Sequence, residues 1–150
     1  MKPRLAALAD YASVAYDGKL NIMGIVAEIN TVKVPFTLPQ MYLVFSLEAD
    51  PMEYGNEYPI RVVLRYENGE GGQLLDLQGS TQIPQPERPS RVLNNQLIGL
   101  GGVTLERAGT YTFSVSVGAE EVAAVPLDVN LVENELTTDS EDEPTGGLDD

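Results

Sequence analysis

The sequence predicts an all-β protein, an antiparallel β-sandwich of about nine strands with a disordered acidic C-terminal tail. Three observations support this fold class. Residues 110–117 alternate without a break between polar and apolar side chains, which only a strand sorts into one polar and one apolar face. Turn-forming residues separate short apolar segments at the spacing typical of a sandwich. No segment shows the amphipathic period of a helix.

The clearest strands lie near the C-terminus, and they predict a hairpin. Residues 109–117 form the first strand and residues 122–129 the return strand. The apolar side of the hairpin consists of Tyr111, Phe113, Val115, Val117, Val125, Leu127, Val129 and Leu131. We expect these side chains to be buried against a second sheet, because two sheets with one apolar face each are stable when packed together.

The N-terminal segment predicts a strand followed by a tight turn. Asp10 ends the apolar run of residues 5–9, which is shorter than the roughly 7–15 residues of a signal-peptide core. Asp17-Gly18 is typical of a tight turn. The apolar phase then changes near Gly24, and a β-bulge explains that change most simply. Residues 32–36 form a further short strand before Pro39.

The middle of the chain predicts further strands over residues 41–47, 60–66, 75–83 and 92–100, with a short one at 103–105. Residues 49–59 contain two prolines and Gly55, so we expect a loop without regular structure. Residues 84–90 contain three prolines and should cross between the sheets as an extended segment.

Length and charge indicate one domain over residues 1–132 and a tail over residues 133–150. The chain has 23 acidic and 9 basic residues, a net charge of −14. The tail holds eight of the acids and no base, which leaves a net −6 for residues 1–132. The tail has few apolar residues, so we expect it to be disordered unless a partner binds it.

Composition also limits the chemistry. The chain has no cysteine and no histidine, and so lacks the usual nucleophile, the usual general base and the usual transition-metal ligands. The acidic surface disfavours nucleic-acid binding. No segment approaches the roughly 18 apolar residues of a membrane-spanning helix. We therefore expect a soluble, cytoplasmic protein with no cofactor and no metal.

Residues 108–113, Ala-Gly-Thr-Tyr-Thr-Phe, resemble the entry to the sixth strand of immunoglobulin-like domains. There a tyrosine stands two residues before a core position and bonds to upstream backbone. The resemblance implies that role for Tyr111. Phe113 stands where antibody domains have a disulfide cysteine, a departure that argues against a secreted immunoglobulin but not against the sandwich.

A second resemblance covers most of residues 3–132. Residues 8–14, 17–24, 39–43, 109–113 and 126–129 are similar to a family of uncharacterised bacterial single-domain β-sandwich proteins. The chain departs from that family at Gly118-Ala119, where an Asp-Gly or Asn-Gly turn is usual, and in its acidic tail. The family has no assigned activity, so the resemblance implies a fold and no site.

The candidate interaction surface is the loop carrying Met52, Tyr54 and Tyr58. Tyrosine and methionine are enriched at protein interfaces. The alternative is that these side chains fold back over the end of the sandwich. We expect a noncatalytic protein-interaction or structural module, a subunit of a larger assembly or a homo-oligomer, with a protein partner.

Two other functions stay open. The first is a ligand-binding sandwich for carbohydrate or calcium. Its calcium ligands would come from a loop whose spacing matches no EF-hand, namely Glu48, Asp50, Glu53, Asn56 and Glu57. A sugar platform would have to use the seven tyrosines, because the chain has no tryptophan and three phenylalanines. The second is a hydrolase that uses Asp10 and Asp17 as acid and base.

Overall fold

The computed structural model describes residues 1–70 and 72–133, and within them the protein is all-β. The predicted tail lies outside the described residues, apart from its first residue. The strands are β1 (Lys2–Val14), β2 (Leu20–Val26), β3 (Glu28–Thr31), β4 (Phe36–Thr37), β5 (Tyr42–Glu48), β6 (Glu57–Tyr66), β7 (Gln73–Gln82), β8 (Leu93–Gly99), β9 (Thr104–Leu105), β10 (Gly109–Val117) and β11 (Glu120–Leu131).

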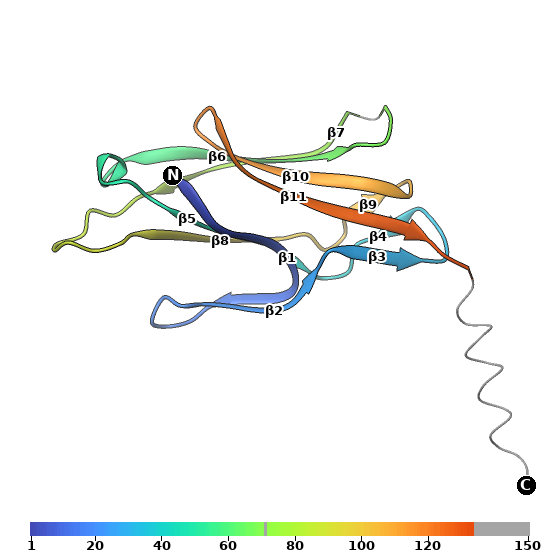
Figure 1. The fold of residues 1–150 in the computed structure, drawn as a ribbon, viewed down its shortest axis with the longest axis horizontal. Helices are drawn as coiled ribbons and strands as arrows, with labels where there is room; N and C mark the ends of the chain where they lie inside the picture. The colour runs from blue at the N-terminus through green and yellow to red at the C-terminus, as the bar shows by residue number, and fades with distance from the viewer. Residues whose placement is uncertain (71, 134–150) are drawn as a thin grey trace, which may run out of the picture.

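Two large sheets stack on one another (Figure 1). One has four strands in the order β2-β1-β5-β8, and the other has five in the order β3-β11-β10-β6-β7. The two-residue strands β4 and β9 form a separate small pair. The prediction of purely antiparallel sheets is wrong at one place, because β3 runs parallel to β11. That pairing joins residues about 100 positions apart in the chain, which the alternation of side chains cannot reveal.

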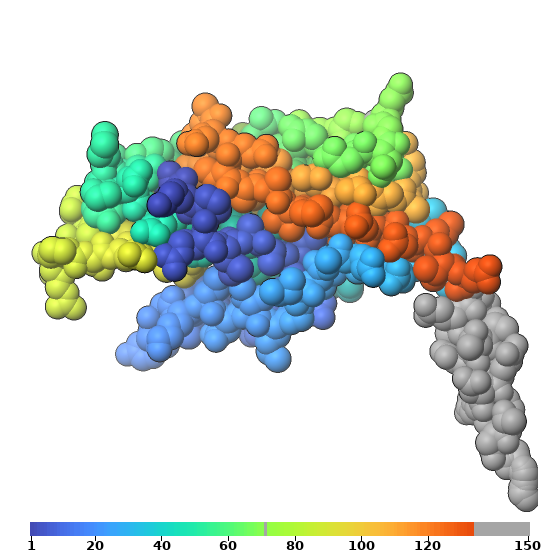
Figure 2. All heavy atoms as spheres, in the orientation of Figure 1, coloured from blue at the N-terminus to red at the C-terminus, as the bar shows by residue number. Residues whose placement is uncertain are grey.

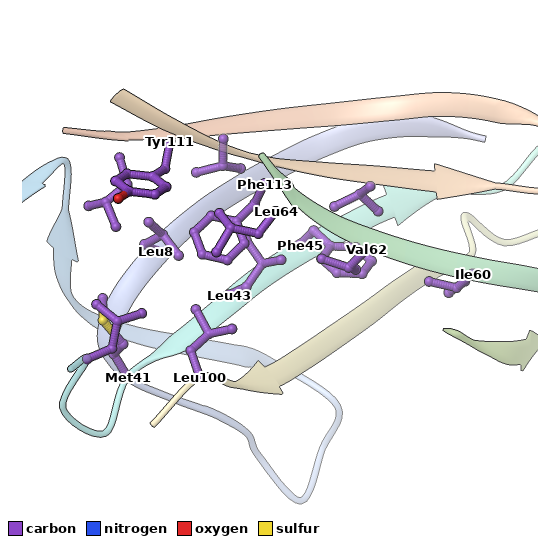
Figure 3. Close-up of a cluster of buried hydrophobic side chains, with 14 of the residues drawn as sticks. Leu8, Met41, Leu43, Phe45, Ile60, Val62, Leu64, Leu100, Tyr111 and Phe113 are labelled. Atoms are coloured by element: carbon purple, nitrogen blue, oxygen red, sulfur yellow. The ribbon is translucent and has the colours of Figure 1, made fainter. Parts of the chain in front are cut away.

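The main core lies between the two large sheets. Leu8 and Phe45 come from the four-stranded sheet and face Val62, Tyr111 and Phe113 from the five-stranded sheet (Figure 3). Each of these five side chains is at most 1% exposed. Burial of such apolar side chains contributes about 1.5–3 kcal/mol each before the entropy of ordering is subtracted. The alternation in residues 109–117 therefore predicted the correct buried face.

The β10–β11 hairpin turns at Gly118, which has φ +63° and donates its N–H to Pro59 O at 2.9 Å. Glycine reaches this left-handed conformation without the penalty that other residues pay. The pairing shifts between Val115 and Ser116, where β11 contains an extra residue. This bulge lets Val122 and Val125 both be buried although they are an odd number of residues apart.

The predicted bulge at Gly24 is wrong in detail. Ala9 pairs with Ile25 and Tyr11 with Met23, so the register between β1 and β2 is the same on both sides of Gly24. Gly24 instead adopts φ +72°. Ile22 packs on the outer side of the four-stranded sheet and Val26 packs in the main core. Ile22 and Val26 are in the same phase, so a bend at glycine, without an inserted residue, explains why they pack on opposite sides of the sheet.

The β1–β2 hairpin consequently forms a cover on the outer face of the four-stranded sheet (Figure 1). Leu20 and Ile22 of β2 pack with Ala9, Ala12 and Val44, a small second core. The sheet is thus buried over part of both faces.

Two loop predictions have different outcomes. The Pro-rich segment does cross between the sheets, because β7 and β8 belong to different sheets. The loop at 49–59 is less irregular than predicted, since Pro51–Glu53 form one 3-10 turn. Proline fits the start of such a turn, where its missing N–H costs nothing.

Candidate functional site

The predicted surface loop divides into one exposed residue and two packed ones. Met52 is 89% exposed. Tyr54 and Tyr58 are partly buried and pack against Ala49, Ile83 and Val92. The Tyr54 hydroxyl donates to Ser90 O at 3.1 Å, and the Tyr58 hydroxyl accepts from Asn56 Nδ2 at 3.3 Å. The two tyrosines therefore cover the end of the sandwich, and Met52 presents the free surface of this loop.

The carboxylates near this loop have protein partners. Glu48 accepts from Arg4 at 3.0 Å and lies 3.3 Å from Arg91 Nε. Glu53 accepts from the Asp50 N–H at 2.8 Å and from the Met1 amino group at 2.9 Å. Burial raises the pKa of Glu53, but these two bonds outweigh it, so the pKa is lowered.

Within residues 1–70 and 72–133, no group of three or more acidic side chains is arranged to hold a metal ion. The five predicted oxygen donors are therefore not gathered around one point.

Asp10 and Asp17 are not brought together. Asp10 lies in β1 beside Gly24, whereas Asp17 lies in the hairpin turn and pairs with Lys19 at 3.4 Å. About 14 Å of strand separates Asp10 from the end of β1 at the usual rise per residue. Glycosidase carboxyl pairs lie roughly 5–9.5 Å apart. These two aspartates do not form such a pair.

A group of exposed apolar residues on the β1–β2 hairpin was missed by the sequence reasoning. We name Tyr11, Met23 and Ile25 the hairpin patch. Tyr11 pairs with Met23, and their exposed fractions are 51% and 65%, while Ile25 is also 65% exposed. The Tyr11 ring contacts Tyr42 edge-on, with ring centroids 6.3 Å apart. Figure 2 shows the hairpin, in lighter blue, projecting from the body of the protein.

A sequence signal for this patch was available. Residues 20–26 contain no charged side chain in a chain with a net charge of −14. β2 is also the edge of its sheet, with β1 as its neighbour among the described strands. Edge strands of soluble proteins are usually protected by charges.

Two cavities lie near the edges of the four-stranded sheet. The edge pocket, about 230 Å³, opens between β7 and β8 and reaches the core at Phe45 and Val62. The hairpin groove, about 470 Å³, lies between the outer face of the sheet and the β1–β2 hairpin. Its lining combines leucine and isoleucine side chains with Arg4, Lys19 and Asn95.

The fold and these surfaces define an all-β protein built on two large stacked sheets. The chain belongs to a family of unknown function, DUF6941, whose model matches residues 4–130. The predicted membership in an uncharacterised single-domain family is confirmed. A search of curated proteins found no match.

Among solved structures, the chain is similar to a β-glucosidase from Listeria innocua in complex with gluconolactone, at 9% identity and a TM-score of 0.44. The match covers 86% of this chain and 17% of that enzyme, so the chain spans less than a fifth of it. A likeness of this size carries no argument about function. In the described residues, no helix combines the length and the apolarity that crossing a bilayer requires.

Proposed function

We propose that this chain is a noncatalytic protein-interaction module, a subunit of a larger assembly that binds its partner through the β1–β2 hairpin. The observation that carries the proposal is the hairpin patch on an uncharged edge strand. Met23 and Ile25 are each 65% exposed on β2. Exposed apolar side chains at an unprotected sheet edge mark sites where another chain adds.

The chemistry of the patch also favours a protein partner. Tyrosine and methionine, two of the residue types enriched at interfaces, lie opposite one another as Tyr11 and Met23. Tyr42 extends the patch onto the neighbouring strand β5. Met52, on the loop between β5 and β6, is a second candidate contact.

We also propose that the sandwich is of the immunoglobulin-like kind. The two large sheets hold four and five strands, nine together, once β4 and β9 are set aside. The Tyr111 hydroxyl bonds to the backbone of Arg107, four residues upstream, as in the tyrosine corner of that fold. β10 lies between β6 and β11, the arrangement of the corresponding immunoglobulin strands.

The test is co-purification of partners with the tagged full chain from its source cells, with and without chemical crosslinking. Met23→Lys/Ile25→Lys places two charges on the edge, and we expect it to lose a protein that the unaltered chain recovers. The control, Val32→Lys/Leu131→Lys, changes two other exposed apolar residues, 45% and 55% exposed, and should retain it.

Two results would contradict the proposal. One is recovery of the same proteins by the edge variant and the unaltered chain. The other is the absence of any specific partner together with a monomeric mass in sedimentation. Loss of the partner in Met52→Lys alone would move the interface to the loop and away from the hairpin.

A further inference from the structure

The hairpin groove has features of a small-molecule site, and these are independent of the proposed protein interface. Its floor is a row of directly paired residues, Leu5 of β1, Ser46 of β5 and Asn95 of β8. Its opposite wall is the turn and the first half of β2, including Leu20 and Ile22. At about 470 Å³ the groove is in the range of ligand pockets, roughly 300–1,000 Å³.

The floor contains a polar atom whose bonding capacity the described protein residues do not use. Asn95 Oδ1 is buried and accepts no hydrogen bond from them. Ser46, directly opposite, is 5% exposed. A buried acceptor without a donor is unfavourable, so such atoms in native proteins call for an explanation. A ligand that draws the Asn95 amide toward the groove and donates a hydroxyl or amide N–H to its Oδ1 supplies one.

The walls and the rim of the groove would contact chemically different parts of that ligand. The walls are aliphatic, from Leu5, Leu20, Ile22 and Leu93. The rim carries Arg4 and Lys19. An apolar body therefore fits the walls, and an anionic group fits the rim.

Each cation of the rim pairs with a carboxylate, and two further cations surround one of those carboxylates. Arg4 and Arg91 both approach Glu48, and Lys19 approaches Asp17, so three cations face two carboxylates. The hydrogen bond from Arg4 is the main cause of the lowered pKa of Glu48, and the charges of Arg91 and Lys2 also lower it. Two of the nine basic residues of the chain thus line this groove, and Arg91 and Lys2 lie near Glu48, the partner of Arg4. The excess positive charge is complementary to an anion.

We propose that the hairpin groove binds a small amphiphilic carboxylate that carries an amide N–H or hydroxyl group. In this binding mode the carboxylate lies at Arg4 and Lys19, the alkyl part contacts the leucine walls, and the donor bonds Asn95 Oδ1. The site is distinct from the hairpin patch, so this inference does not depend on the proposed function.

The test follows the binding of N-hexanoylglycine by backbone amide NMR of the full chain. This probe has the carboxylate, the alkyl part and the amide N–H that the binding mode requires. We expect saturable shifts at residues 20, 22, 46, 93 and 95 at about 10 mM probe, roughly tenfold above a 1 mM dissociation constant. The methyl ester, without the charge, should bind at least about tenfold more weakly, a loss of 1.4 kcal/mol. Hexanoate lacks the N–H and should also bind more weakly.

Variants separate the three contacts. Arg4→Gln/Lys19→Gln should weaken the acid but not its ester, and Asn95→Leu should remove the difference between N-hexanoylglycine and hexanoate. Arg65→Gln is the control for the lost charge, because Arg65 lies exposed on β6 in the other sheet. Amide spectra of each variant without probe verify that it is folded.

Three outcomes would overturn the proposal. These are no saturable shift at the groove residues, equal affinity for acid and ester, or shifts confined to Tyr11, Met23 and Ile25. The last outcome would assign the probe to the hairpin patch, and it would leave the proposed protein interface standing.

Discussion

The hydroxyl of Tyr111 is bonded to both backbone groups of Arg107. It donates to Arg107 O at 2.6 Å and accepts from Arg107 N–H at 3.1 Å. The Tyr111 ring also packs on Tyr66, with centroids 5.0 Å apart, and the Arg107 guanidinium lies 4.0 Å above the Tyr66 ring. One side chain thus fixes the loop before β10 to the strand itself.

Tyr111→Phe should therefore destabilise the protein by about 1–2 kcal/mol, because it removes both bonds and leaves the backbone of Arg107 without them. Chemical denaturation of the two proteins measures this difference. Thr112→Val, at a partly buried neighbouring position, is a control that keeps the corner. Equal stability of the Tyr111→Phe variant and the unaltered protein would show that the corner adds nothing.

The same residue predicts a response to alkaline pH. Burial raises the pKa of Tyr111 above its ordinary value of 10.0. The folded state therefore favours the neutral phenol, and this contribution is complete below pH 10 and is lost as the pH rises through the folded pKa. Above about pH 10 the unaltered protein should lose more stability than Tyr111→Phe as the pH rises toward the folded-state pKa, as followed by thermal melting. Parallel losses in the two proteins would contradict this.

Gly79 should tolerate a larger residue. Gly79 lies in β7 opposite Ile60 of β6, and it lines the edge pocket. A Cβ atom at this position would meet no atom within 4 Å. Gly79→Val should stabilise the protein by about 1 kcal/mol through lower unfolded-state entropy and added apolar burial. Gly109→Ala should have the opposite effect, because its Cβ would lie 2.6 Å from Asn68 Oδ1 at φ +134°. Thermal melts of both variants test the pair, and a lower melting temperature for Gly79→Val would contradict the expectation.

The bend at Gly24 should depend on glycine for two separable reasons. Its φ of +72° disfavours other residues by about 1–2 kcal/mol, and a Cβ would lie 2.6 Å from Asp10 Oδ2. Gly18→Ala, at φ +89° with nothing within 4 Å, has the backbone penalty alone. We expect the Gly24→Ala protein to be less stable in urea than the Gly18→Ala protein. Adding Asp10→Ala to Gly24→Ala should recover that difference in stability. If Asp10→Ala recovers nothing, the contact with Asp10 is not the cause.

The pair between Arg61 and Asp76 should control a carboxyl titration. Arg61 donates two bonds, at 2.9 and 2.8 Å, and this lowers the pKa of Asp76 below its ordinary 3.8. Because the pKa of Asp76 is lower in the folded state, the pair stabilises the fold above about pH 4. This stabilisation is lost as the pH falls through the folded-state pKa of Asp76. Carbon-detected NMR should show the Asp76 pKa rising in Arg61→Gln.

Glu48 provides the crossed control for that titration, because the hydrogen bond from Arg4 is what mainly lowers its pKa. Arg61→Gln should leave the titration of Glu48 unchanged, and Arg4→Gln should leave that of Asp76 unchanged. An Asp76 titration that is the same with and without Arg61 would contradict the assignment.

The sequence by itself determined the all-β class, the hairpin of β10 and β11 and the buried face carrying Phe113 and Val115. Side-chain alternation is a local property, and burial of one face follows from it directly. Resemblance, in addition, indicated the role of Tyr111. The parallel pairing of β3 with β11 was not predictable, because it depends on contacts between distant segments.

Only the tertiary structure decided where candidate sites lie. The loop tyrosines were predicted as a surface, but Tyr54 and Tyr58 pack on the sandwich end and leave Met52 outside. The groove beside Asn95 lies where Leu20 and Ile22 of β2 pack on the outer face of their own sheet. A pattern of period two assigns faces to a strand, but it does not specify which surface that strand will cover.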